Sequence, residues 1–186
     1  MYIPVPMRLE HLFFNLAVAI AIGMAYQWKT GRDPSVIIVV VAFLPDLDVF
    51  VHGWVHLLAW LSGITILFYH GSFHNILALV LFSLGLAFIA SRFGVPFRDA
   101  CLCIAIGYAT HLVCDAVAFN KFADLLWPLL PIATEPVPYW YHPDLFGLAQ
   151  GSVLAIALAL VLIAALVRTL REGKGWIRNY TAPRFG

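Results

Sequence analysis

The sequence predicts an all-α integral membrane protein, a helical bundle with about five transmembrane helices and one further interfacial or re-entrant helix. Hydrophobic residues make up 62% of the 186 residues and charged residues only 11%, whereas soluble domains carry about 25% charged residues. The mean hydropathy is +0.90. Apolar runs close to the ~20 residues that a helical span needs recur along the chain. Together these observations favour a membrane bundle over a soluble domain.

The apolar runs give the expected spans in chain order. A short basic turn follows the first run, and a proline interrupts the second. Basic residues also separate the third run from the fourth, and a long connection rich in prolines and aromatic residues precedes the fifth. The expected spans are residues 11–28, 35–51, 74–90, 99–117 and 148–167.

The positions of the basic residues favour one orientation. Lys and Arg are concentrated in cytoplasmic loops, so we expect a single transmembrane domain, 1–170, followed by a basic cytoplasmic tail, 171–186. The other basic turns then also fall in the cytoplasm only if residues 53–69 do not cross the membrane. We therefore expect a protein of the cell (inner) membrane, with residues 53–69 lying at its outer side.

This topology brings several metal-ligand residue types to one membrane depth. They lie near the outer ends of four separate segments, where an unpaired charge would be costly. A single polar site would account for all of them. The candidates are His11, Asp46, Asp48, His70, His74, His111 and Asp115.

Two of the candidate pairs have helical spacing. His111 and Asp115 are four residues apart, which places both side chains on one helix face within an apolar run. His70 and His74 have the same spacing, which lets two imidazoles bind one metal ion. The alternatives are a structural His–Asp hydrogen bond for the first pair and interfacial histidines for the second.

The remaining candidates depend on the local backbone. Asp46 and Asp48 are two residues apart, so a regular helix would point them in different directions, but Pro45 disturbs the helix there. A break could turn both carboxylates toward one cavity; the alternative is a solvated pair at a helix end. His11 is either a further ligand, a proton shuttle, or a solvated residue beside Glu10.

The number of ligands favours one or two divalent ions, with zinc expected. A tetrahedral zinc takes about four ligands, and two ions bridged by a carboxylate would use the whole set. Asp48 and Asp115 are the catalytic candidates, since one aspartate could serve as a general base. The sequence has no Gly-x-Ser-x-Gly or His-Glu-x-x-His motif, so water is the expected nucleophile.

The order of these motifs resembles the YdjM-like family, described as LexA-regulated, membrane-bound, metal-dependent hydrolases. The likeness covers about residues 8–131 and includes an early histidine, Pro-Asp-x-Asp, a segment with two histidines, and His-x3-Asp before Leu-Trp-Pro. It implies a metal-dependent hydrolase and names no substrate. Gly71, Phe73 and Asn75 stand where the family commonly has Arg, Thr and Ser.

The hypothesis from sequence is hydrolysis by metal-activated water at the outer membrane interface, with a lipid phosphoester or ester as substrate. We expect membrane lipids as partners and no nucleic acid. Two alternatives remain at this point: an intramembrane metal-ion or proton transporter, which also uses buried Asp and His, and a non-catalytic membrane scaffold held together by these residues.

Overall fold

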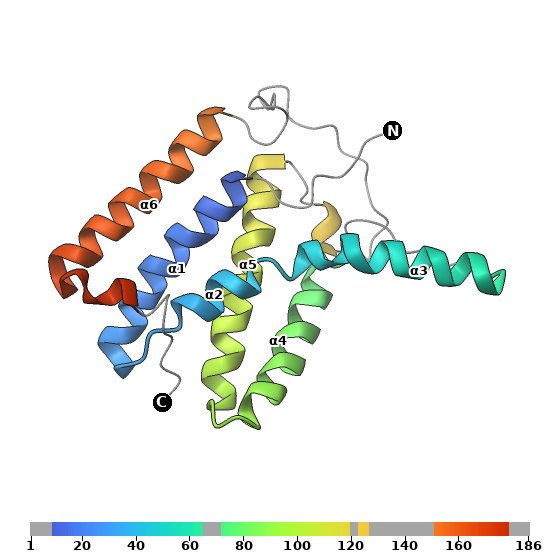
Figure 1. The fold of residues 1–186 in the computed structure, drawn as a ribbon, viewed down its shortest axis with the longest axis horizontal. Helices are drawn as coiled ribbons and strands as arrows, with labels where there is room; N and C mark the ends of the chain where they lie inside the picture. The colour runs from blue at the N-terminus through green and yellow to red at the C-terminus, as the bar shows by residue number, and fades with distance from the viewer. Residues whose placement is uncertain (1–8, 65–71, 120–122, 127–150, 179–186) are drawn as a thin grey trace.

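The computed structural model describes residues 9–64, 72–119, 123–126 and 151–178, and every regular element within these ranges is helical. The all-α prediction is therefore confirmed. Figure 1 shows the arrangement of the helices. The main ones are α1 (Leu9–Thr30), α2 (Ser35–Val41), α3 (Asp48–Ser62), α4 (Ile76–Ser91), α5 (Phe97–Phe119) and α6 (Gly151–Glu172).

Four helical stretches in the described residues are long and apolar enough to cross a membrane. They are Leu9–Thr30, Ser35–Ser62, Phe97–Ala116 and Gly151–Glu172, and α4 is a shorter apolar helix. In the bundle α6 packs along α1, α4 packs along α5, and α2 lies between α1 and α5. Apart from α3, which continues in the general direction of α2, consecutive helices run in alternating directions (Figure 1), in agreement with the five expected spans.

The second expected span is broken, and the break occurs where the sequence predicted it. Pro45 has no backbone N–H, and its ring clashes with the carbonyl four residues earlier, so α2 ends at Val41. A 3-10 turn, η1 (Pro45–Leu47), then leads into α3. The boundary differs from the expectation, because the further helix begins at Asp48 and not near residue 53. At seven residues, α2 is only about 10 Å long and reaches part of the way along the bundle.

Helix α3 extends away from α4 and α5 (Figure 1), and Asp48 is its single buried residue. Its apolar side chains are exposed, with Trp54 at 68% and Trp60 at 79%. Tryptophan is enriched where a membrane meets water, so this surface suits a helix lying in the interface plane. The helix ends at Gly63, whose φ of 69° is readily adopted only by glycine.

The end of the bundle opposite Asp48 is basic. All eight described lysines and arginines lie near the α1–α2 turn, the α4–α5 turn or the C-terminal part of α6. One of them, Arg168, is fully buried. Its guanidinium donates to Asp33 at 2.5 Å, Gln27 at 2.6 Å and Glu172 at 3.0 Å. The bonds to Asp33 and Gln27 tie α6 to the α1–α2 turn and to the end of α1, and the bond to Glu172 lies within α6.

Candidate metal centre

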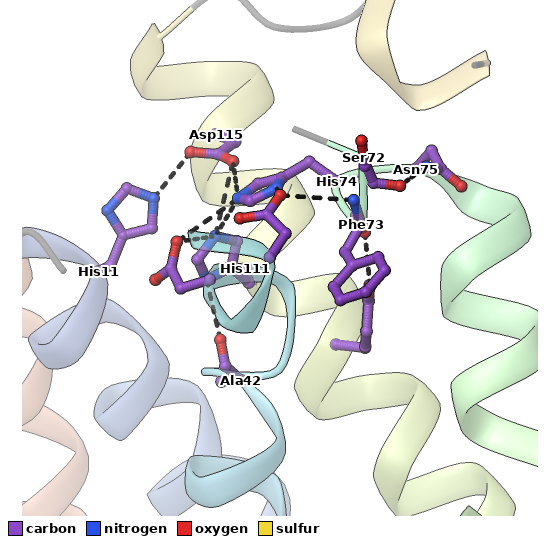
Figure 2. Close-up of polar contacts among 11 residues, drawn as sticks. His11, Ala42, Ser72, Phe73, His74, Asn75, His111 and Asp115 are labelled. Atoms are coloured by element: carbon purple, nitrogen blue, oxygen red, sulfur yellow. Dashed lines mark hydrogen bonds and ion pairs between the residues drawn. The ribbon is translucent and has the colours of Figure 1, made fainter. Parts of the chain in front are cut away.

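Four ligand-type atoms from three separate segments converge where α2, α4 and α5 meet (Figure 2). The two ring nitrogens, Nε2 of His74 and Nε2 of His111, lie 3.2 Å apart. Asp115 Oδ2 lies 3.4 Å from the first and 3.5 Å from the second. Asp46 Oδ1 lies 3.5 Å and 3.7 Å from the same two atoms. We call these four residues the His–Asp cluster.

The backbone of the broken second span fixes His111. Its Nδ1 donates a hydrogen bond to the Ala42 carbonyl at 2.8 Å. Ala42 follows directly after α2, so no continuing helix takes up this carbonyl. Because Nδ1 carries the proton, the Nε2 lone pair of the neutral ring faces the cluster, which is the tautomer a metal ligand needs.

Asp48 fixes His74 in the same way. His74 lies in the turn ahead of α4, and its Nδ1 is 3.2 Å from Oδ2 of the fully buried Asp48. The same carboxylate oxygen accepts the Phe73 backbone N–H at 3.5 Å. Asp48 therefore reaches the cluster through His74. Burial opposes the charged imidazole, but hydrogen bonds to Asp46 and Asp48 outweigh it and raise the pKa of His74 to about 9.

His11 enters from α1 and contacts Asp115. Its Nε2 lies 2.9 Å from Asp115 Oδ1, so the two oxygens of Asp115 face different groups. The rings of His11 and His111 are 4.8 Å apart between centroids. Two triads of potential ligand atoms result and share His111: one with His11 and Asp115, the other with Asp46 and His74.

Each carboxylate oxygen lies at a distance from the two ring nitrogens that suits a tetrahedral cation. Zinc–ligand bonds of about 2.0–2.2 Å place tetrahedral ligand atoms about 3.3–3.6 Å apart, and the five cluster distances run from 3.2 to 3.7 Å. In addition, both Nδ1 atoms are committed to acceptors, so two neutral rings would point their Nε2 lone pairs at each other. A proton or a cation between them relieves that repulsion, and a divalent ion also offsets the two nearby carboxylates.

Other residues that the sequence did not single out support this geometry. The buried Tyr108 donates its hydroxyl to the Phe73 carbonyl at 2.5 Å, which ties the turn carrying His74 to α5. Gly107 allows α5 to approach α2, because a Cβ there would lie 2.5 Å from the Ile38 carbonyl oxygen. Glycine inside a helix costs stability relative to alanine. A glycine at position 107 of this helical segment is therefore the sequence feature that could have indicated a close helix–helix approach.

Not every predicted candidate joins the cluster. His70 lies outside the described residues. Asp48 contacts His74 and belongs to neither triad. Polar residues that the sequence left aside, Glu10 and Asn15, are fully buried on α1 beside His11 and one turn beyond it. His11 and Asn15 are four residues apart within an apolar run, and this spacing places both side chains on the same helix face.

Fold and site together define a class: an integral membrane helical bundle with a buried histidine–aspartate centre near one end. The sequence matches the YdjM inner membrane protein family over residues 7–176. The chain therefore belongs to this family of inner membrane proteins, and the resemblance drawn from its motifs is confirmed. The search of curated proteins and that of solved structures gave no match.

Proposed function

We propose that this protein is a membrane-bound, metal-dependent hydrolase that cleaves a phosphoester or ester bond of a membrane lipid. The observation that carries the proposal is a pair of imidazole nitrogens 3.2 Å apart, with one oxygen of Asp46 and one of Asp115 each within 3.4–3.7 Å of both nitrogens. Such a set is costly to bury unless it binds a cation. Family membership agrees with the location in the inner membrane.

The four side chains differ in accessibility, and this suggests their roles. Side-chain exposure is 2–7% for His74, His111 and Asp115, against 17% for Asp46. We assign the three buried residues as fixed ligands of a divalent ion, with zinc expected. Asp46 is the exchangeable ligand on the accessible side, where a catalytic centre needs an open position.

A divalent ion bound there supplies Lewis acidity and makes water a nucleophile near neutral pH. Asp46 then accepts the proton of the attacking water as general base, because its carboxylate faces the cluster and remains accessible. Asp48 holds His74 in its ligand tautomer. His11 holds Asp115 through Oδ1 and leaves Oδ2 facing the cluster.

The location of the cluster points to a lipid. It lies at the end of the bundle away from all the described basic residues, which by the positive-inside tendency is the outer side. The exposed tryptophans of α3, which begins at the cluster, suit the level of the lipid head groups. At this depth in the membrane, the cluster can reach a substrate bond that lies near the lipid head group.

The transporter alternative needs polar groups continuing across the bundle. Between the cluster and the buried Arg168, Ala19, Ile38 and Cys103 form a buried apolar cluster where α1, α2 and α5 pack together. Packing of this kind leaves no chain of ionisable groups among those residues. It favours a site that works from one face of the membrane.

The test compares two substitutions in purified protein supplied with phospholipid vesicles. Asp46→Asn should abolish hydrolysis and keep most of the bound metal, whereas His111→Ala should lose both. His56→Ala on the exposed part of α3 is the matched control and should keep both. Lipid products are measured by mass spectrometry and metal by elemental analysis. Wild-type protein that holds metal and cleaves no phospholipid or ester lipid would contradict the proposal.

A further inference from the structure

A groove of about 450 Å³ runs along α4. It begins at the turn formed by Ser72, Phe73 and Asn75 and ends at Ile89, near the basic end of the bundle. Below Asn75 its lining is entirely apolar, with Gly85 as a small residue among leucines and Phe82. Leu81 remains 61% exposed at its edge.

The upper end of the groove adjoins the His–Asp cluster. Ser72 and Asn75 lie on the α4 side of the cluster (Figure 2) and flank His74 in the sequence. Phe73, which lines the groove, donates its backbone N–H to Asp48 and accepts from Tyr108. A molecule in the groove would therefore have one end beside the candidate metal centre.

The length and chemistry of the groove select its occupant. Leu77 to Ile89 covers about 18 Å of helix, close to the ~15 Å depth of one leaflet of the hydrocarbon core. The apolar lining offers no side-chain hydrogen-bonding group over that length, so it suits a hydrocarbon chain and excludes a polar ligand. In an inner membrane protein, the hydrocarbon at this depth is the acyl chain of a lipid.

We propose that this groove holds one acyl chain of a membrane lipid whose head group lies at the His–Asp cluster. The inference rests on the proposed function and names the substrate class: a long-chain glycerolipid, positioned by its tail. The cleavable bond then lies near the head group, at the polar end of the groove. Van der Waals packing along the concave surface provides the preference over the exposed face of α6.

The test measures lipid contact directly, so it does not depend on catalysis. The full-length protein is placed in nanodiscs of phosphatidylethanolamine and phosphatidylglycerol that contain phosphatidylethanolamine with a diazirine on its acyl chain. After irradiation, labelled peptides are mapped by mass spectrometry. We expect labelling of the α4 segment 77–89 several-fold above that of α6, in wild-type protein and in His111→Ala alike.

Substitution within the groove supplies the control. Gly85→Phe should reduce labelling of α4 several-fold, and a Cβ at Gly85 meets nothing within 4 Å, so the side chain starts in open space. Leu84→Phe, on the same helix and outside the groove, should leave labelling unchanged. Gly85→Val is the smaller block if the phenylalanine variant does not fold.

Two outcomes would overturn the inference. One is equal labelling of α4 and α6 that Gly85→Phe does not alter. The other is an α4 that stays unlabelled in wild-type protein while α6 is labelled, as a second copy of the chain covering the groove would produce. Labelling as expected without any lipid hydrolysis would support the groove and count against the proposed function alone, so the two failures can be told apart.

Discussion

Each histidine of the cluster has one ring nitrogen bound by the protein and the other directed at a common point. For His111 the partner is a backbone carbonyl, that of Ala42, and for His74 it is the carboxylate of Asp48. Such partners fix both the tautomer and the ring orientation of a metal ligand. The role of Asp48 is therefore to position His74.

Replacing Asp48 by asparagine tests this role. The amide is nearly isosteric but uncharged, and its NH2 group can donate to Nδ1 and favour the wrong tautomer of His74. We expect metal affinity to fall about 10–100-fold, with the helical content unchanged. Competition with a chelator measures the affinity, and Asp99→Asn at the basic end is the control. Unchanged affinity in Asp48→Asn would remove Asp48 from the site.

The raised pKa of His74 predicts that metal binding at the proposed site depends on pH. In the metal-free protein this imidazole stays protonated up to about pH 9, and an ion must displace that proton to bind Nε2. Apparent affinity should therefore rise with pH, about tenfold per unit between pH 7 and 9, and then level off. Chelator competition at fixed ionic strength measures the slope. An affinity that is constant from pH 6 to 9 would contradict this assignment.

At the scale of elements, the contact between α2 and α5 positions the cluster, since α2 presents the Ala42 carbonyl to His111. Gly107→Ala would place a methyl group 2.5 Å from the Ile38 carbonyl oxygen and force the two helices apart. Backbone displacement of this kind typically costs about 1–3 kcal/mol, and metal affinity should fall with it.

The same helical substitution at Gly85 is the control, because space is open there. Gly85→Ala should be neutral or stabilise the protein by up to about 1 kcal/mol. Thermal unfolding in detergent compares the two variants. Equal stability of Gly107→Ala and Gly85→Ala would show that the close approach of α2 and α5 does not matter.

Helix α6 depends on the buried Arg168. Arg168→Ala leaves the Asp33 carboxylate without its guanidinium partner and should cost about 3–5 kcal/mol, as expected for breaking a buried ion pair. The double variant with Asp33→Ala should recover part of that loss. Arg171→Ala, on the exposed side of the same helix, should change the midpoint of thermal unfolding little. If Arg168→Ala and Arg171→Ala lowered the midpoint of thermal unfolding by similar amounts, the buried ion pair of Arg168 would not be a major source of stability.

Sequence periodicity could anticipate the His111–Asp115 pair and the break at Pro45, because both arise from local geometry. It could not anticipate that His11 contacts Asp115 across 104 residues, or that a backbone carbonyl orients His111. It also missed the burial of Arg168, since a basic residue at the end of an apolar run is usually solvated. Contacts of this kind depend on how the helices pack, which the spacing of residues does not encode.

At the scale of the whole molecule, the described basic residues gather at one end and the His–Asp cluster lies toward the other. We predict that the C-terminus is cytoplasmic and that the cluster faces the outer side. Reporter fusions test this: a fusion after residue 186 should be active only as a cytoplasmic reporter, and one within 142–146 only as an outer-side reporter. The reverse pattern would place the cluster at the cytoplasmic face.

The proposed hydrolase depends first on binding of a divalent ion by the His–Asp cluster. The most direct test of this binding is the metal content per chain of gently purified protein, with the wild type measured beside His111→Ala. We predict about one or two equivalents of zinc or a similar divalent ion in the wild type, lost in the variant while the helical content is kept. A wild type that holds no metal and takes up none on addition would contradict the proposal, and the cluster would then be a structural hydrogen-bond network.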